Sequence, residues 1–497
     1  MSVSRISLWP ALPKARIHPN IYGHFTEHLG RCIYDGLWVG PQSRIPQQQG
    51  VRLDVLAALK QLRVPVVRWP GGCFADDYHW RDGIGPAQER PATVNLWWQQ
   101  TEPNEFGTDE FTRFCRAAGC EPYICCNVGS GSPREARDWL EYCNFGGEST
   151  LSRLRGAHGS PDPYQVKYWG VGNENWGCGG RFQPVDYARE YIRFANYLRV
   201  LDPGIELIAC GTHFGDYRNP VLNRWNHDFC QEMYHPDLID HLSLHRYFSR
   251  GRGAGFTDTE FEATFADVLA MERDLELTEA VLRYAYPDKR VGIIIDEWGM
   301  WHPEATAANG LEQVHTLRDA LLAGAALNCF NRWAHRVTMA NLAQTINVLQ
   351  CLAMTDGGKM FLTPTYYIFE LMRGHMGAQL LTQEVECPFY EAHPIGFSGK
   401  RSVPVLSVSA SLSGKRLLLS VVNQSLMDDV EARIELCEAK FGAVAGRILH
   451  SEDPHDQNSF KDTKKVVPRR LKIEAGPEGL VHTFPAHSFT ALSIAVE

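Results

Sequence analysis

The stretch Val166–Gly180, VKYWGVGNENWGCGG, places the tightest limit on what this chain can fold into. Its first half carries the β-branched and aromatic side chains of a buried strand. The strand pattern then stops at Asn173-Glu174-Asn175, and a glycine-rich turn follows, where missing Cβ atoms allow a ligand to come close. A parallel α/β barrel keeps its chemistry at such strand ends. The stretch therefore predicts a strand that delivers a carboxylate to a functional site.

A second stretch, Arg290–Trp301 (RVGIIIDEWGMW), has the same form. Its apolar run ends in Asp296 and Glu297, followed by tryptophan and glycine. Because the carboxyl ends of all strands in a parallel barrel face one central mouth, the two stretches bring two carboxylates to the same place. We therefore predict a paired-carboxylate site formed by Glu174 and Glu297.

Strand and helix patterns alternate through most of the chain. Eight strand patterns begin near residues 21, 64, 121, 166, 206, 239, 291 and 328. Helical patterns lie between them, such as Leu53–Leu62 and Pro133–Asn144. We predict that 314–330 runs from a helix into the eighth strand, and that 341–355 is helical. A doubly wound sheet is disfavoured because no GxGxxG follows the first strand and no GxxxxGK[ST] occurs. The predicted fold class is α/β, a TIM (β/α)8 barrel.

The two ends of the chain show strand patterns without the alternating helices of the central part. After about residue 375, short alternating strands separated by turn residues predict an all-β sandwich of the jelly-roll type. Residues 3–17 look like a short strand pair that lies outside the barrel. We therefore expect three parts: 1–16 as strands joining the sandwich, 17–375 as the catalytic barrel, and 376–497 as the C-terminal sandwich.

Composition excludes some partners. The formal net charge is −9 and the pI about 6.1, whereas binding to nucleic acid needs clustered lysine and arginine. No apolar run is long enough to span a membrane, and the N-terminus lacks the apolar segment of a secretory signal. The fourteen cysteines are then expected to be reduced thiols of a cytoplasmic protein. Cys73 is expected to be a thiol that is buried or lines the site.

Two carboxylates at a barrel mouth are suited to glycoside hydrolysis. One must be protonated to assist the leaving oxygen, and the other must be ionised to attack the anomeric carbon. The aromatic neighbourhood of Glu174 favours the acid role. Glu297 needs cationic or hydrogen-bonding neighbours to stay charged. The candidates at strand ends are Arg68, His245 and Tyr247.

Other readings of the same residues stay open at this point. Several histidines at strand ends are typical of barrel metallohydrolases, and His24, His28 and His245 could form such a site. The first strand lacks an HxH pair, however, so we expect no metal and no cofactor. Cys115 and Cys120 are interpreted as structural rather than as zinc ligands. A non-catalytic carbohydrate-binding protein would keep the aromatic residues without needing both glutamates.

Seven separated motifs, taken together and in order, carry a resemblance to a known family. The chain resembles the α-L-arabinofuranosidases of glycoside hydrolase family 51 over nearly its whole length. The motifs are IYGHFTEHLGRCIYDGLWVG, VVRWPGGCFADDYHWRDGIGP, NEFGTDEF, YWGVGNENWGCGG, HLSLHRYF, IIIDEWGMW and PAHSFTAL.

The resemblance implies retaining, exo-acting removal of terminal α-L-arabinofuranosyl residues from oligosaccharides derived from arabinan or arabinoxylan. It implies Glu174 as acid/base and Glu297 as nucleophile, and a homo-oligomer such as a hexamer. The same machinery acting on β-xylosides or galactofuranosides, or as an endo-β-glucanase, remains the alternative. The implied substrate-binding residues are Glu27, Arg68, Cys73, Trp98, Asn173, His245 and Tyr247.

The chain departs from the best-known family pattern at two positions. Cys73 stands where many members have asparagine, so one contact to a sugar hydroxyl is expected to be changed or lost. Thr363 is nearest to the position where many members carry a glutamine.

Overall fold

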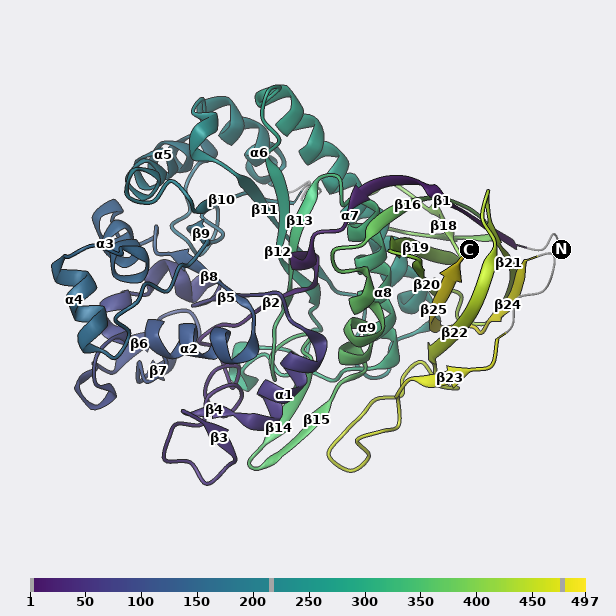
Figure 1. Cartoon of the computed structure of the whole chain (residues 1–497), viewed down its shortest axis with the longest axis horizontal. Coiled ribbons are helices and arrows are strands. Elements are labelled where there is room, and N and C mark those ends of the chain that lie inside the picture. Colours follow the sequence, from purple (N-terminus) through teal and green to yellow (C-terminus); the bar gives the residue numbers. More distant parts are fainter. Residues whose placement is uncertain (1–3, 214–218, 474–478) are drawn as a thin grey trace.

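The computed structural model describes residues 4–213, 219–473 and 479–497. Eight parallel strands close into a barrel, with neighbours in the order β2-β5-β8-β9-β10-β11-β12-β13 (Figure 1). The chain runs round the barrel in sequence order, which is the arrangement of a TIM barrel. The strands are β2 Gly23–Phe25, β5 Val66–Trp69, β8 Glu121–Cys126, β9 Tyr168–Val171, β10 Glu206–Cys210, β11 His241–Phe248, β12 Gly292–Met300 and β13 Val337–Ala343.

Helices surround this barrel. Their ends follow local sequence signals: the Ser132 side chain accepts a hydrogen bond from the Glu135 amide at the start of α3, and Gly119 ends α2 in the left-handed conformation. None of the described helices is both long and apolar enough to cross a lipid bilayer. They are α1 Leu53–Leu62, α2 Thr108–Ala118, α3 Pro133–Asn144, α4 Thr150–Ala157, α5 Pro184–Leu201, α6 Pro220–Glu232, α7 Asp258–Ala285, α8 Leu317–Arg332 and α9 Pro364–Met372.

Side chains alternate between the two faces of the barrel strands. Outward residues pack against the helices in one large core. Inward residues fill the barrel in a separate cluster made of Val66, Tyr123, Tyr168, Ile208, Ile294 and Met339. The barrel is therefore packed through its interior, and the candidate site lies where the strands end.

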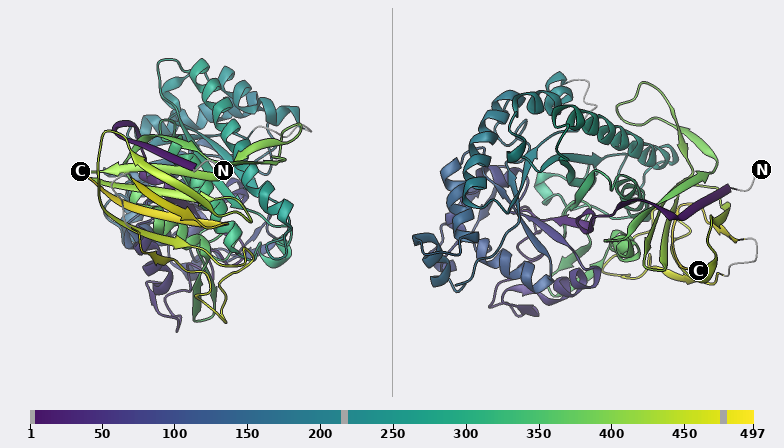
Figure 2. Two further views of the ribbon diagram at one scale, coloured as in Figure 1. Left: turned by 90° about the vertical axis from the view of Figure 1, so that its right-hand side faces the viewer. Right: turned by 45° about the horizontal axis from the view of Figure 1, so that its top comes forward.

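A nine-stranded sheet lies beside the barrel, with α8 and α9 between them (Figures 1 and 2). Asn328 of α8 donates a hydrogen bond to the Ser407 carbonyl, which ties the helix to the sheet. The opposite face of the sheet encloses a core of its own. The strand order is β23 Arg469–Leu471, β22 Phe441–Leu449, β25 Ser488–Val496, β20 Arg416–Asn423, β19 Leu406–Ser413, β16 Gln379–Glu386, β1 Ser4–Arg16, β21 Val430–Leu436 and β24 Leu480–Phe484.

Small elements complete the described chain. The two-stranded pairs are β3 Gln47–Gln48 with β4 Val51–Arg52, β6 Thr93–Asn95 with β7 Gln100–Glu102, β14 Ala353–Asp356 with β15 Lys359–Leu362, and β17 Phe389–Ala392 with β18 Arg401–Pro404. The 3-10 turns are η1 Pro19–Tyr22, η2 Cys73–Asp77, η3 Trp80–Gly83, η4 Ala87–Glu89, η5 Pro236–Leu238, η6 Ala307–Asn309 and η7 Arg373–His375.

The predicted barrel and its sheet-rich C-terminal companion are confirmed, but the prediction near the eighth strand is wrong. Residues 317–332 are all helical, as α8, and the last barrel strand is β13. Nearly every residue of α8 is buried, so the amphipathic period that separates helix from strand is absent there. The segment 341–355 holds the end of β13 and the start of β14, not a helix.

The N-terminal segment is one long strand rather than a strand pair. β1 pairs antiparallel with β16 and parallel with β21, so the chain begins in the sheet and then enters the barrel. Residues 1–3 and 474–478 of the expected parts lie outside the described residues. The division into 1–16, 17–375 and 376–497 stays a prediction.

Candidate active site

The two predicted carboxylates lie at the carboxyl end of the barrel. β9 ends at Val171, and Glu174 stands in the loop that follows, half-buried. Glu297 lies on β12 with only 5% of its surface exposed. They come from the fourth and the seventh barrel strands, so the closure of the sheet is what makes them neighbours.

His245 on β11 joins the two glutamates. Its Nδ1 is 2.9 Å from Oε1 of Glu174 and 3.5 Å from Oε2 of Glu297. The nitrogen and one carboxylate oxygen from each glutamate lie within 4.8 Å of one another. Carboxyl groups about 5–5.5 Å apart are typical of glycosidases that retain the anomeric configuration, whereas inverting enzymes hold them about 6.5–9.5 Å apart to admit a water. The separation is that of a retaining site.

Arg68, at the end of β5, is buried beneath Glu297. Its Nη1 donates to Oε1 of Glu297 at 2.8 Å, and its Nη2 donates to Oδ1 of Asn173 at 2.5 Å. Its Nε lies 3.5 Å from Oδ2 of Asp296. Removing one partner of such a buried ion network leaves an uncompensated charge. Arg68 therefore fixes the position of Glu297 and orients the amide of Asn173.

The surroundings of Glu297 favour its charged form. Burial raises the pKa of its carboxyl, but the positive charges of His245 and Arg68 and the hydrogen bonds from Arg68 and Tyr247 outweigh that effect and lower it. The hydroxyl of Tyr247 donates to Oε2 at 2.7 Å. Burial lowers the pKa of His245, but the carboxylates of Glu297 and Glu174 raise it further, above its usual value. A carboxylate kept ionised and held from two sides is suited to attack as a nucleophile.

The variant Tyr247→Phe tests this hydrogen bond. Loss of a donor to the charged form raises the pKa of Glu297, so a higher pH is needed to ionise it. We expect the acidic limb of kcat/KM to move up by about one pH unit, with about a tenfold loss of activity at neutral pH. The measurement is a pH–rate profile on p-nitrophenyl α-L-arabinofuranoside, the substrate type that the sequence resemblance implies. An unchanged acidic limb would show that Tyr247 does not support the ionised carboxylate.

Glu27 follows β2 and lies close to Glu297, since a Cβ at Gly72 would be 3.6 Å from Oε1 of Glu27 and 2.9 Å from Oε1 of Glu297. The Phe74 amide and Trp98 Nε1 donate to its Oε1 at 3.2 and 3.1 Å, and Gln344 Nε2 donates to its Oε2 at 3.0 Å. Burial and the charge of Glu297 raise the pKa of Glu27 to about 7. A carboxyl poised in this way can donate or accept a hydrogen bond to a sugar hydroxyl. The structure thus brings Glu27 and Trp98 to the same mouth as the paired glutamates.

Sequence reasoning missed Gln344. The sequence predicts a helix over 341–355, whereas Gln344 directly follows the barrel strand β13 and its side chain reaches Glu27. Thr363, nearest in sequence to the expected glutamine, lies at the start of α9, and its hydroxyl donates to the Cys351 carbonyl. An eighth strand placed correctly at 337–343 would have indicated Gln344.

The expectation of a reduced Cys73 is wrong. Cys73 forms a disulfide with Cys178, while the other twelve cysteines are free. The loops after β5 and β9 bring the two Cα atoms to 5.5 Å, inside the range that a disulfide spans. The partners are 105 residues apart in sequence, so no local pattern could have indicated the pairing.

The other histidines considered as metal ligands do not join the paired glutamates in a group of possible ligands. His24 is buried against the Phe369 ring, and burial lowers its pKa to about 3. His28 is hydrogen-bonded to Glu102 and to the Trp69 indole. Within the described ranges, the groupings that could supply three ligands are Cys73 with Glu174 and Cys178, and Glu174 with His245 and Glu297. In the first grouping the sulfur atoms are already bonded to each other.

A (β/α)8 barrel whose mouth holds one ionised, buried glutamate and a second glutamate at retaining distance defines a retaining glycoside hydrolase. The profile described as "Alpha-L-arabinofuranosidase 1 domain" matches residues 58–250, and "Alpha-L-arabinofuranosidase C-terminal domain" matches 296–488. A protein of Bacteroides ovatus named intracellular exo-α-L-arabinofuranosidase is 39% identical, covering 97% of this chain and 93% of that protein.

Solved structures agree with this match. The GH51 arabinofuranosidase of Xanthomonas axonopodis pv. citri superposes with a TM-score of 0.92 at 34% identity, covering 99% of this chain and 100% of that one. The GH51 α-L-arabinofuranosidase of Thermotoga petrophila RKU-1 gives 0.89 at 35% identity, with 99% of each chain covered. The chain belongs to the α-L-arabinofuranosidases of glycoside hydrolase family 51.

Proposed function

We propose that this chain is a retaining exo-α-L-arabinofuranosidase in which Glu297 is the nucleophile and Glu174 the acid/base. One observation carries the assignment: both carboxylates lie within 4.8 Å of each other and of His245, while Arg68 and Tyr247 hold Glu297 in its charged form. Family membership supplies the substrate class. The proposed reaction needs no cofactor, because Glu174 supplies the proton donor and Glu297 the ionised nucleophile.

The first step forms a covalent intermediate. A carboxylate oxygen of Glu297 attacks the anomeric carbon while Glu174 gives its proton to the glycosidic oxygen, so the C1–O bond breaks and the aglycone leaves as an alcohol. His245, hydrogen-bonded to Glu174 at 2.9 Å, keeps that carboxyl directed toward the nucleophile. The step ends with an arabinosyl ester on Glu297 and an ionised Glu174.

In the second step the roles of Glu174 reverse. The carboxylate takes a proton from water as the water attacks C1, the ester bond breaks, and Glu297 leaves as a carboxylate. Two inversions at C1 give net retention. Arg68 and Tyr247 stabilise the leaving Glu297 with the same hydrogen bonds that held it at the start.

The remaining predicted residues are proposed to bind the furanose ring. Glu27, Asn173 and Trp98 lie around the pair and present hydrogen-bonding groups to the mouth. Gly72 leaves the space for a sugar, since a Cβ there would come within 2.9 Å of Oε1 of Glu297. Gln344 is added to this set because its amide orients Glu27.

For the wider setting, we propose oligosaccharides from arabinan or arabinoxylan as substrates, action inside the cell, and a homo-oligomeric assembly such as a hexamer. The name of the Bacteroides ovatus relative supports the exo mode and the intracellular setting. The oligomer rests on the family resemblance.

The test is hydrolysis of p-nitrophenyl α-L-arabinofuranoside beside p-nitrophenyl β-D-xylopyranoside, with the released anomer followed by NMR. We expect fast release from the arabinofuranoside, with α-L-arabinose as the first product before mutarotation. First release of the β anomer would contradict the double displacement. A higher kcat/KM on the xyloside, or cleavage only of internal β-glucan bonds, would contradict the proposed substrate class.

A further inference from the structure

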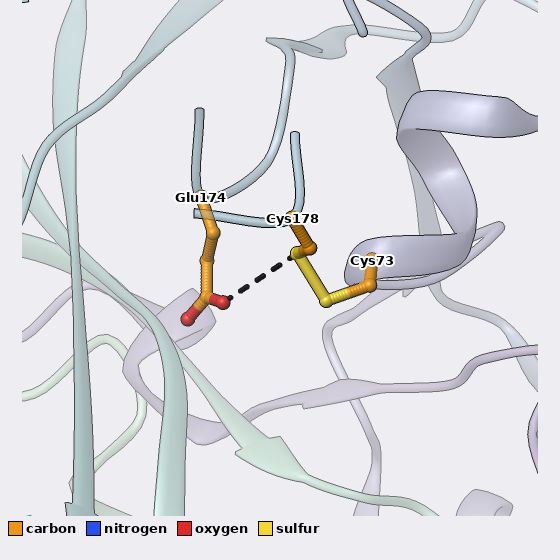
Figure 3. Close-up of side chains that lie close together, drawn as sticks. All are labelled: Cys73, Glu174 and Cys178. Atoms are coloured by element: carbon orange, nitrogen blue, oxygen red, sulfur yellow. Dashed lines mark hydrogen bonds between the residues drawn. A yellow bond between two sulfur atoms is a disulfide. The ribbon is translucent and has the colours of Figure 1, made fainter. Parts of the chain in front are cut away.

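The Cys73–Cys178 disulfide joins the loop after β9, which carries the proposed acid/base Glu174, to the segment after β5. Cys73 is the first residue of η2, which follows β5 and the Gly71-Gly72 pair. Cys178 lies four residues after Glu174 in the loop after β9. Figure 3 shows the bond lying directly beside the carboxyl of Glu174. The bond therefore links the acid/base loop to the segment that follows β5, across the intervening strand β8.

The contact with Glu174 is close. Sγ of Cys178 is 3.7 Å from Oε2 of Glu174, and the side-chain Nδ2 of Asn173 is 3.9 Å from the same sulfur. While the disulfide is intact this sulfur has no hydrogen to donate, so it offers the carboxyl an apolar, polarisable surface. A free Cys178 thiol would instead present an S–H donor to the same carboxyl oxygen. The redox state of the bond thus changes what the acid/base touches.

The backbone of Glu174 also needs outside support. Its φ is 42°, in the left-handed region that non-glycine residues rarely adopt. Asp76 lies in η2, as Cys73 does. It accepts hydrogen bonds from the backbone amide of Asn173 at 2.7 Å and from the side-chain Nδ2 of Asn175 at 3.3 Å. Asp76 thus holds the start of the loop, and the disulfide holds the position beyond Glu174.

We propose that the Cys73–Cys178 disulfide is a positioning element for Glu174, whose reduction selectively weakens hydrolysis of substrates with poor leaving groups. The proposal rests on the acid/base role given to Glu174 above. Because Asp76 and the buried strands remain in place, reduction loosens the loop without unfolding the barrel. Acid assistance matters most for an alcohol leaving group and least for nitrophenolate, so the effect depends on the substrate.

Reduction is chemically accessible. Both cysteines are only partly buried, whereas nine of the twelve free cysteines are fully buried. One thiolate of dithiothreitol attacks a sulfur of the bond and forms a mixed disulfide; its second thiolate then displaces the protein sulfur. The protein gains two electrons and two protons as two thiols, and dithiothreitol becomes its cyclic disulfide. In a reducing cytoplasm such a bond is expected to respond to redox conditions.

The experiment compares kcat/KM for methyl and p-nitrophenyl α-L-arabinofuranoside in oxidised enzyme, in dithiothreitol-treated enzyme and in Cys178→Ala. For the reduced enzyme and the variant we expect about a tenfold loss on the methyl glycoside, part of the 10²–10⁴ that a general acid supplies, and a change below about twofold on the nitrophenyl glycoside. Reoxidation restores the wild type, and Cys178→Ala no longer responds to dithiothreitol. The matched control is Cys387→Ser, a half-buried free cysteine in the sheet domain, which keeps the wild-type response.

Two readouts separate positioning from a general structural role. The thermal midpoint of the reduced enzyme should stay well above the assay temperature, and the loss of kcat/KM should depend on the leaving group. Equal losses on both substrates, or no loss on either, would overturn the proposal. If the oxidised enzyme cleaves no arabinofuranoside, or Glu174→Ala shows no dependence on leaving group, the proposed function itself has failed instead.

Discussion

Replacing Glu297 by alanine is expected to lower kcat on p-nitrophenyl α-L-arabinofuranoside by about 10⁴-fold or more. The reason is that Glu297 is the proposed nucleophile and Glu174 the proposed acid/base. The nearby carboxyl of Asp296 is held by hydrogen bonds from Tyr123 and Asn341, and that of Glu27 by hydrogen bonds from Trp98 and Gln344. Steady-state kinetics measure the loss. Sodium azide should restore part of the rate, because the shorter side chain leaves room for a small anion, and the product should be the inverted β-arabinosyl azide.

The control for this variant is Glu206→Gln. Glu206 is also a glutamate on a barrel strand, but it begins β10, at the opposite end of the barrel, where it pairs with Lys167 and His241. We expect it to keep wild-type kinetics within about twofold, because surface ion pairs contribute little. Near-wild-type activity of Glu297→Ala, or equal losses in the two variants, would contradict the nucleophile assignment.

The barrel could be predicted from sequence because its signals are local. Apolar strands that end in glycine or a polar residue, and helices with clear caps, can be recognised one at a time, as at Leu53–Leu62 and Pro133–Asn144, where the observed helices have the predicted bounds. The prediction failed at α8, where burial on all sides removes the amphipathic period. One misplaced strand then hid Gln344, since a residue predicted in a helix is not expected at the barrel mouth.

Some features of the site could be predicted from local sequence patterns, and others are determined only by the folded chain. Glu174 and Glu297 could be predicted because each ends its own strand pattern, and barrel closure brings strand ends together. Their separation, the contact of His245 with both, and the Cys73–Cys178 bond depend on register and on loop paths between distant segments. Those are properties of the folded chain that no short stretch of sequence encodes.

Replacing Glu174 by alanine is expected to divide substrates by leaving group. Without the acid, kcat/KM on methyl α-L-arabinofuranoside should fall by about 10²–10⁴-fold, while the p-nitrophenyl glycoside, whose leaving group needs little protonation, loses less than about tenfold. The second step also lacks its base, so stopped-flow measurements should show a burst of nitrophenolate followed by slow turnover.

Azide decides between the two glutamates. In Glu174→Ala the arabinosyl ester on Glu297 still forms, and azide attacks it from the face that Glu174 vacated, so the product is the retained α-arabinosyl azide. In Glu297→Ala azide takes the place of the nucleophile and the product is β. The two anomers are distinguished by NMR, and each variant serves as the control for the other. If the anomers were exchanged between the variants, the roles would be exchanged too, and His245 would be bonded to the nucleophile at 2.9 Å instead of to the acid.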